Sequence, residues 1–248
     1  MTTICLIGYG KMGRMLHQLA PEKGLKVVGM VDPVWDGAAR EISRDSLNNA
    51  DVAIEFSHPS AVLSNLERLL DLNQNCVIGT TGWHQDLPRI VEMAKSSGIG
   101  MVYGANFSLG MNLFSRLIVD AVKLFDGFDD YDLMAWEKHH AQKADSPSGT
   151  AVELAKLILE NSSRKTKVVW DRLQRRPEAE ELHFASIRGG KIPGTHVLAF
   201  DSDADTIELS HVVRSRATFA LGALQAAKWI AGKSGVYSFQ DLIADILC

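Results

Sequence analysis

Apolar and polar positions alternate in a regular order along the first hundred residues. Short apolar runs rich in β-branched residues predict strands, and between them apolar positions recur every three to four residues, which predicts helices. The predicted strands are Thr3–Ile7, Leu25–Val31, Val52–Phe56, Cys76–Ile78 and Ile99–Tyr103, and the predicted helices are Lys11–Ala20, Ser60–Leu72 and Asp86–Ser97. Strands and helices that alternate in this way predict an α/β fold, with a parallel sheet covered by helices on both faces.

After Asn106 the strands and helices no longer alternate. The spacing predicts a helix at Leu109–Phe125, a strand at Tyr131–Glu137 and a helix at Ala151–Glu160. A charged segment follows, and then three runs predict antiparallel strands, at Leu182–Ile187, Thr195–Phe200 and Thr206–Val213. This change of pattern predicts a second domain of the α+β class. Residues 216–248 return to a helical pattern and could pack on either domain.

The composition narrows the classes of function. A net charge of −4 argues against a nucleic-acid binder, which would carry a basic stripe. No apolar run reaches the roughly 18–20 residues of a membrane-spanning helix, so we expect no membrane partner. Three cysteines, Cys5, Cys76 and Cys248, lie far apart without a C-x-x-C pair. We therefore expect buried or terminal thiols in a reducing cytoplasm rather than disulfides or a cysteine zinc site.

A glycine-rich turn lies between the first predicted strand and the first predicted helix. It has the pattern G-x-G-x-x-G, and Asp32 ends the second predicted strand. In this context the pattern predicts a dinucleotide site, in which the glycines let the backbone approach a pyrophosphate and Asp32 accepts hydrogen bonds from ribose hydroxyls. The expected contacts are Gly8, Tyr9, Gly10, Lys11, Met12, Gly13 and Asp32. Without a cofactor, the same residues would form a tight turn and a turn-forming Asp-Pro.

The carboxylate of Asp32 bears on the choice of cofactor. It favours NADH and repels the additional phosphate of NADPH, although Lys11 and Arg14 could partly compensate. Two later loops follow predicted strands at the edge where open α/β sheets bind ligands. Their small residues would admit a nicotinamide ring, and the expected contacts are Gly79, Thr80, Thr81, Gly104, Ala105, Asn106 and Phe107.

The stretch from Glu137 to Ala151, EKHHAQKADSPSGTA, gathers the most chemistry in the chain. Ser148 suits the N-cap of the helix that follows, so free N–H groups at Ser148–Thr150 would attract a carboxylate. His139, His140 and Lys143 stand just upstream and add two imidazoles and an ammonium group. Together these groups predict a site for an anionic substrate that is protonated as it reacts.

Each of these groups also has an ordinary structural interpretation. A single histidine can be a surface or packing residue, and Lys143 alone would be a solvated charge. A zinc site needs further ligands, and neither His58 nor His84 is spaced to supply one, so we expect no metal.

The stretch resembles the signature E-x-H-H-x-x-K-x-D-x-P-S-G-T-A of the 4-hydroxy-tetrahydrodipicolinate reductase family, and it matches throughout. Other similar segments cover most of the chain: Gly8–Gly13, VIGTTGW at 77–83, ANFSLGMN at 105–112, IRGGKIPGTHVLAF at 187–200 and SRATFALGALQAAKWIAGKSG at 215–235. The resemblance implies an enzyme that reduces 4-hydroxy-2,3,4,5-tetrahydrodipicolinate to 2,3,4,5-tetrahydrodipicolinate with loss of water, in the diaminopimelate route to lysine. NADH or NADPH supplies the hydride.

The resemblance also implies an organisation and a set of roles. Residues 1–108 and 217–248 would form a Rossmann-type dinucleotide-binding domain, and residues 109–216 an α+β domain with a mixed or antiparallel open sheet, which binds substrate and forms a homotetramer. His139 would be the acid/base residue and Lys143 the proton donor. The substrate carboxylate would be bound by His140, Gly149 and Thr150.

Two rival functions share parts of this pattern. Another two-domain NAD(P)H dehydrogenase would share the Rossmann half, but the Ser-Gly-Thr turn argues against it. A non-catalytic NADH sensor would not need His139 and Lys143. Pyridine-2,6-dicarboxylate is a planar mimic of the product ring. It separates the reductase from a pure NADH sensor, because the sensor should not bind it.

Overall fold

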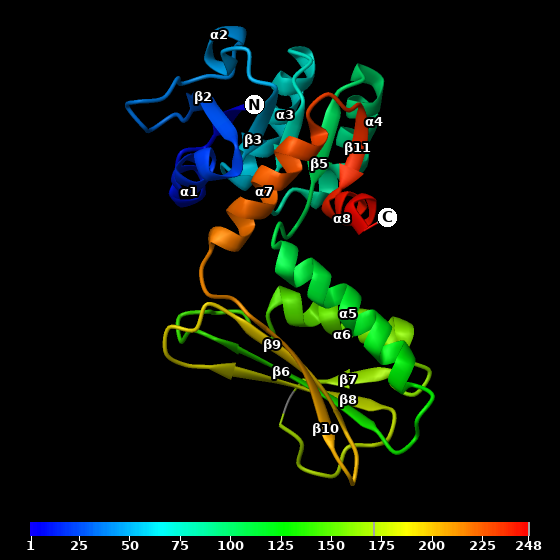
Figure 1. The fold of residues 1–248 in the computed structure, drawn as a ribbon. Helices are drawn as coiled ribbons and strands as arrows, with labels where there is room; N and C mark the ends of the chain where they lie inside the picture. The colour runs from blue at the N-terminus through cyan, green and yellow to red at the C-terminus, as the bar shows by residue number, and fades with distance from the viewer. Residues whose placement is uncertain (171, 248) are drawn as a thin grey trace. The chain divides into compact units, whose positions relative to one another are not determined.

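The computed structural model describes residues 1–170 and 172–247, and Cys248, one of the expected thiols, lies outside them. The chain divides into two compact units (Figure 1). Unit 1 is Met1–Leu109 with Ala217–Cys248, and unit 2 is Gly110–Arg216. Each unit has its own sheet and its own hydrophobic core.

Unit 1 contains a six-stranded parallel sheet in the order β11-β5-β4-β3-β1-β2. The strands are β1 (Thr2–Ile7), β2 (Leu25–Val31), β3 (Val52–Glu55), β4 (Cys76–Ile78), β5 (Gly100–Tyr103) and β11 (Gly235–Ser238). Central strands such as β4 are buried along their whole length, as expected of a parallel sheet covered on both faces. The strand order reverses between β1 and β3, and ligands of open α/β sheets bind at such a reversal.

Helices cover both faces of this sheet. Helices α3 (Pro59–Asp71) and α4 (Leu87–Ser97) pack on one face, and α1 (Lys11–Leu19) and α7 (Ala217–Ile230) lie together on the other. Figure 1 shows α7, from near the end of the chain, crossing the sheet. Small residues on α7 allow this close packing. The remaining helices are α2 (Arg44–Leu47), α8 (Phe239–Leu247) and the 3-10 turns Pro21–Lys23 and His84–Asp86.

Unit 2 contains a five-stranded mixed sheet in the order β10-β9-β6-β8-β7. The strands are β6 (Asp132–His139), β7 (Lys167–Val169), β8 (Glu181–Arg188), β9 (Thr195–Asp201) and β10 (Thr206–Val212). Helices α5 (Leu109–Phe125) and α6 (Gly149–Asn161) bury apolar side chains against one face of this sheet. The predicted fold class, a Rossmann-type α/β sheet with a second, mixed sheet, is confirmed.

Several local predictions were wrong. The strand at 182–187 was expected to be antiparallel, but β8 runs parallel to both of its neighbours, because α6 and β7 form a crossover that returns the chain to the same edge. The last segment is not wholly helical, since β11 adds a parallel strand beside β5. β7 was missed, and β6 continues past Glu137 to His139.

None of the helices in the described ranges has the length and apolar character that crossing a bilayer requires.

Candidate active site

The glycine turn of unit 1 requires glycine at two points for steric reasons. Gly8 has a φ of +88°, and a Cβ there would lie 2.2 Å from the Phe56 carbonyl oxygen. A Cβ at Gly13 would lie 2.1 Å from the Gly8 oxygen. Gly10, the N-cap of α1, has no atom within 4 Å of where its Cβ would be, and no side chain caps the helix. The first N–H groups of α1 are therefore open to an anion, and the turn fits a pyrophosphate.

Asp32 connects this turn to the loop that follows β2. Its Oδ2 accepts a hydrogen bond from the Tyr9 amide at 2.7 Å, and its Oδ1 accepts from the amides of Val34 at 2.8 Å and Trp35 at 2.9 Å. Partial burial raises the pKa of Asp32, but these backbone hydrogen bonds outweigh it and hold the pKa below its ordinary value. The carboxylate is therefore ionised, and its negative charge lies beside the expected nucleotide site.

Sequence analysis gave no role to Trp35, which forms an aromatic group with the glycine turn. Its ring lies 5.5 Å from the Tyr9 ring, and the Arg14 guanidinium lies 4.5 Å from the centre of the indole. Arg40 donates to the Pro33 carbonyl at 2.9 Å and pairs with Asp36 at 2.8 Å. The loop after β2 is thus folded on itself, with Arg40 close to Asp32 and Arg14 over Trp35.

The other expected cofactor contacts differ in burial, and Gly79, Gly104 and Asn106 are half-buried. Thr80 is buried, its hydroxyl accepts a hydrogen bond from the Ser57 amide at 2.8 Å, and its carbonyl accepts from the Trp83 indole at 2.7 Å. Phe107 is buried too, with its ring 4.7 Å from that of Phe239. Thr81 and Ala105 are exposed.

In unit 2 the face of the sheet that carries α5 and α6 changes character along its strands. Residues such as Ala135, Leu198 and Phe184, which lie in one cross-strand row, form the apolar core beneath the helices. Two residues further along each strand the same face turns polar. The cross-strand row is His211, His196, Glu137 and Ser186, and His139 pairs with Arg188 in the next position.

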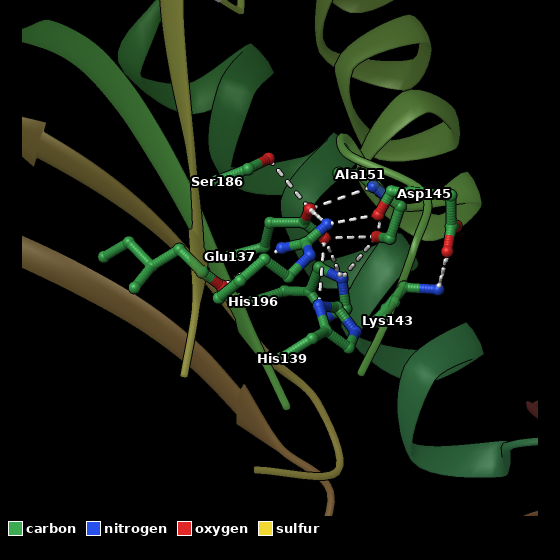
Figure 2. Close-up of polar contacts among 10 residues, drawn as sticks. Glu137, His139, Lys143, Asp145, Ala151, Ser186 and His196 are labelled. Atoms are coloured by element: carbon green, nitrogen blue, oxygen red, sulfur yellow. Dashed lines mark hydrogen bonds and ion pairs between the residues drawn. The ribbon is translucent and has the colours of Figure 1, made fainter. Parts of the chain in front are cut away.

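Glu137 is the centre of this polar region and is fully buried (Figure 2). Its Oε1 accepts hydrogen bonds from the Ser148 amide at 2.9 Å, the Ser186 hydroxyl at 2.8 Å and Arg188 Nη2 at 2.8 Å. Its Oε2 accepts a hydrogen bond from the Ser148 hydroxyl. Burial alone would raise the pKa of this carboxyl, but hydrogen bonds from His196, Ser148 and Arg188 hold it far below its usual range.

These bonds correct one expectation. The Ser148 amide was predicted to be free for a substrate carboxylate, but it is committed to Glu137. Ser148 is the N-cap of α6, as predicted, and its hydroxyl accepts a hydrogen bond from the Ala151 amide at 3.1 Å. Gly149 and Thr150 are the first two residues of α6, where N–H groups have no carbonyl of their own helix to reach. The N–H groups that could form an anion cradle are therefore those of these two residues.

His139 lies beside Glu137 and is 7% exposed. Its Nδ1 is 3.3 Å from Glu137 Oε2. Burial lowers the pKa of His139 to about 4; Glu137 acts in the opposite direction, while His196, Lys143 and Arg188 lower it further. The imidazole is therefore neutral at neutral pH, which suits a proton acceptor better than a donor.

Lys143 forms an ion pair with Asp145, at 2.7 Å and 2.8 Å from the two carboxylate oxygens (Figure 2). Sequence analysis gave no role to Asp145, although an opposite charge two residues away was a signal. Arg188 Nη2 donates to the Asp145 carbonyl at 2.6 Å and so ties this loop to β8. His140 is half-buried in the same loop. The structure thus brings His139, His140, Lys143, Gly149 and Thr150 into one region of unit 2.

Donor atoms of Glu137, His139 and His196 lie within 4.8 Å of one another, which is close enough to hold a metal ion. The carboxylate, however, already accepts four hydrogen bonds, one of them from a guanidinium. A divalent cation would displace these donors and lie beside the positive charge of Arg188. The donor set fits a hydrogen-bonded cluster better than a metal centre.

Comparisons with known proteins agree over both units. The family model described as dihydrodipicolinate reductase, N-terminus, matches residues 2–107, and the C-terminus model matches residues 110–243. A 4-hydroxy-tetrahydrodipicolinate reductase from Christiangramia forsetii is 35% identical over 245 residues, which is 98% of each chain. One from Zymomonas mobilis is 36% identical over 248 residues, covering 97% of this chain and 96% of the relative.

A similar fold occurs in a solved structure described as a dipicolinate-bound dihydrodipicolinate reductase from Paenisporosarcina sp.. Its TM-score is 0.78 at 22% identity, and the match covers 98% of this chain and 99% of that one.

Proposed function

The chain belongs to the dihydrodipicolinate reductase family, and we infer from this that it is an NAD(P)H-dependent oxidoreductase that reduces 4-hydroxy-tetrahydrodipicolinate in the diaminopimelate route to lysine. The observation that carries the proposal is the polar cluster of unit 2, where His139 and Lys143 lie beside an open helix N-terminus. Unit 1 binds the nucleotide in this proposal, and unit 2 binds the substrate.

The substrate ring carries two carboxylates and therefore needs cations and N–H donors. Gly149 and Thr150 offer N–H groups at the positive end of α6, a helix of 13 residues. His140 and Lys143 add donors from the preceding loop. The dipicolinate bound by the Paenisporosarcina relative is a planar ring with two carboxylates, which supports a small dicarboxylate as the ligand of unit 2.

When bound, the reduced nicotinamide supplies a hydride. Reduction adds this hydride and one proton to the ring, and the hydroxyl group leaves as water with a ring proton. Lys143 donates the proton, and its ammonium group is paired with Asp145. His139 is neutral because burial lowers its pKa, and it accepts a proton in this proposal. A positioned proton donor or acceptor contributes about 10²–10⁴-fold in rate.

For the cofactor we propose that NADH is preferred and that NADPH is also used. The ionised Asp32 carboxylate would repel a 2′-phosphate. Arg40 is engaged with a backbone carbonyl and Asp36, so the cations left for a phosphate are Lys11 and Arg14, of which Arg14 lies over Trp35. The cofactor contacts named in the sequence analysis remain part of this proposal.

We also propose a homotetramer in the cytoplasm. The face of the unit 2 sheet opposite α5 and α6 carries exposed apolar side chains, Met134, Ile187 and Val212, which suit a sheet-to-sheet interface. Cys5 and Cys76 are free, buried thiols, as is common in reducing compartments. Equilibrium sedimentation tests the assembly.

The function is tested by following NADH absorbance with freshly generated 4-hydroxy-tetrahydrodipicolinate, with NADPH in parallel. Turnover with either cofactor supports the proposal, and the ratio of the two kcat/KM values measures the preference. Folded protein that binds NADH but turns over neither cofactor would contradict it and favour a sensor. Stabilisation by pyridine-2,6-dicarboxylate distinguishes a reductase from a dehydrogenase that shares only the Rossmann unit.

A further inference from the structure

The carboxylate of Glu137 uses its two oxygens for different purposes. Oε1 accepts three hydrogen bonds, from the Ser148 amide, Ser186 and Arg188. Oε2 accepts a hydrogen bond from the Ser148 hydroxyl and lies next to the imidazoles of His139 and His196. The first oxygen therefore anchors the side chain, and the second is presented to the histidines (Figure 2).

The anchor fixes the orientation of the carboxylate. Its three donors come from two other elements, the N-cap of α6 and two residues of β8, and all bond to a residue of β6. A carboxylate held by several donors in the interior cannot rotate without breaking hydrogen bonds that water would not replace. Oε2 is thus kept at a fixed position.

The geometry at Oε2 dictates where the histidine protons are. Nδ1 of His139 lies 3.3 Å from it and Nε2 of His196 lies 3.5 Å from it, with the two rings in an edge-to-face arrangement at 5.3 Å. An ionised carboxylate only accepts hydrogen bonds. The buried Nδ1 of His139 makes no hydrogen bond with any described residue, so the charge of Glu137 Oε2, 3.3 Å away, acts on it electrostatically. A proton on Nδ1 is therefore stabilised, which leaves Nε2 with the lone pair.

Nε2 of His139 lies where a small neighbour leaves it uncovered. A Cβ at Gly194 would come within 3.1 Å of Nε2 and 3.4 Å of Cδ2. Gly194 lies between β8 and β9. A side chain at this position would cover Nε2 of His139. The lone pair of Nε2 is directed away from Glu137, since the two ring nitrogens point in opposite directions.

Building on the proposed function, we propose that Glu137 is a positioning residue that, with His196, holds His139 as the Nδ1-protonated tautomer, so that Nε2 is the proton acceptor facing the substrate. Lys143 remains the proton donor. The two roles then cannot be exchanged at neutral pH, because His139 presents a lone pair and Lys143 presents N–H groups. Neutral imidazole without such a partner populates both tautomers, and one of them would present the wrong atom.

The test reads the tautomer directly, without substrate. The full chain is labelled with ¹⁵N-histidine, and long-range ¹H–¹⁵N correlations are recorded at neutral pH, with His139→Asn used to assign the His139 signals. We expect the Nδ1–H tautomer in the wild type and a mixture, or the Nε2–H tautomer, in Glu137→Gln. Ser186→Ala is the matched control, because it removes a bond to Oε1 but keeps the charge at Oε2. It should retain the wild-type tautomer.

Kinetics provide the second readout. Glu137→Gln should lower kcat by about 100-fold, as expected for a misdirected acid/base group, with little change in KM. Ser186→Ala should lower kcat by less than about tenfold. If Glu137→Gln fails to fold because Arg188 loses its partner, the double variant Glu137→Gln with Arg188→Met restores the charge balance and takes its place in both measurements.

The outcomes separate this inference from the function on which it rests. If the wild type shows no turnover, the proposed function is contradicted. The tautomer of His139 can still be measured in that case, because its test uses no substrate. A wild type that turns over with His139 as Nε2–H overturns the inference alone. A folded Glu137→Gln variant with wild-type kcat overturns it too, as does a loss of kcat without a change of tautomer. Stoichiometric metal in the purified protein, whose removal by a chelator makes the Nδ1–H signal of His139 appear, would replace it with a metal site.

Discussion

Glu55 in unit 1 and Glu137 in unit 2 are both fully buried, but their surroundings differ. Glu137 has donors on both oxygens, including a guanidinium. Glu55 accepts hydrogen bonds at Oε1 from the Ser57 hydroxyl and from Asn65 at 3.2 Å, while its Oε2 is buried with no partner in the described part of the chain. Burying a carboxylate is costly unless donors compensate for lost water. The comparison indicates that donors compensate both oxygens of the buried carboxylate in unit 2 but only one oxygen of that in unit 1.

The largest effect is expected from removing the charge of unit 2 altogether. Glu137→Ala leaves Arg188 without its carboxylate and Ser148 without two of its hydrogen bonds. We expect the free energy of unfolding to fall by about 3–5 kcal/mol, the usual result of breaking a buried ion pair. Chemical denaturation followed by far-UV circular dichroism measures it. A loss of less than about 1 kcal/mol would contradict the view that this charge is integral to unit 2.

Two lysines of unit 2 separate an effect on activity from an effect on stability. Lys143→Ala removes the proposed proton donor, so kcat should fall by about 100-fold or more with little change in melting temperature. Lys165 is buried and donates to Asp132, Ala179 and Glu181, at 2.6 to 2.9 Å. Lys165→Met should therefore lower the melting temperature but leave the kcat of folded enzyme near that of the wild type. Equal effects of the two substitutions on kcat would remove Lys143 from the mechanism.

Gly194 tests whether the uncovered nitrogen of His139 matters. Gly194→Ala places a Cβ about 3.1 Å from Nε2, which should lower kcat/KM by roughly tenfold by blocking the proton acceptor. The control is Gly189→Ala in the same loop, where a Cβ would have no neighbour within 4 Å. Steady-state kinetics of the two variants decide the point, and matching losses would indicate that loop flexibility, rather than covering of Nε2, is responsible.

The pH dependence of stability reports on the buried titratable groups of unit 2. Burial lowers the pKa of His139 from 6.5 to about 4, so the unfolded chain binds its proton more readily and stability falls as the pH drops through this range. The lowered pKa of Glu137 adds to the loss below about 4.5. His139→Asn should flatten the curve between pH 6.5 and 4 by up to about 1.4 kcal/mol per pH unit. Chemical denaturation of the wild type and of His139→Asn at stepped pH checks this prediction. Parallel curves of unfolding free energy against pH would refute it.

The smallest effect is expected in unit 1. Glu55→Gln keeps a carbonyl oxygen for Ser57 and Asn65 and replaces the unpartnered oxygen with an amide of the same shape. We expect a change in unfolding free energy of less than about 1 kcal/mol, in either direction. A loss comparable to that of Glu137→Ala would mean that unit 1 also depends on a buried charge.

The alternating strands and helices of unit 1 could be predicted because they depend on local periodicity. β7, α2 and β11 were missed, since elements of three or four residues carry almost no periodic signal. The direction of β8 was wrong because strand orientation depends on the path of the intervening crossover rather than on the residues of the strand.

The residues of the polar loop could be selected from the sequence, but their geometry could not. Glu137 was visible as the first residue of the signature, yet Ser186 and Arg188, which anchor it, lie 49 and 51 positions further along. His196 became relevant only through its pairing with Glu137 across β6 and β9. Likewise, nothing local showed that the Ser148 amide would be committed to a buried carboxylate.

Helix α6 has consequences for anyone who wishes to redesign the substrate preference. Its first two residues belong to the proposed anion cradle, while Ala151, Leu154, Ala155 and Ile158 lie in the core of unit 2. A directed-evolution library that varies those four positions would tilt the cradle along with the core, so gains in stability there would shift affinity as a side effect. Libraries aimed at new ring shapes should hold α6 and Gly194 constant and vary Gly189, where a Cβ would have no neighbour within 4 Å.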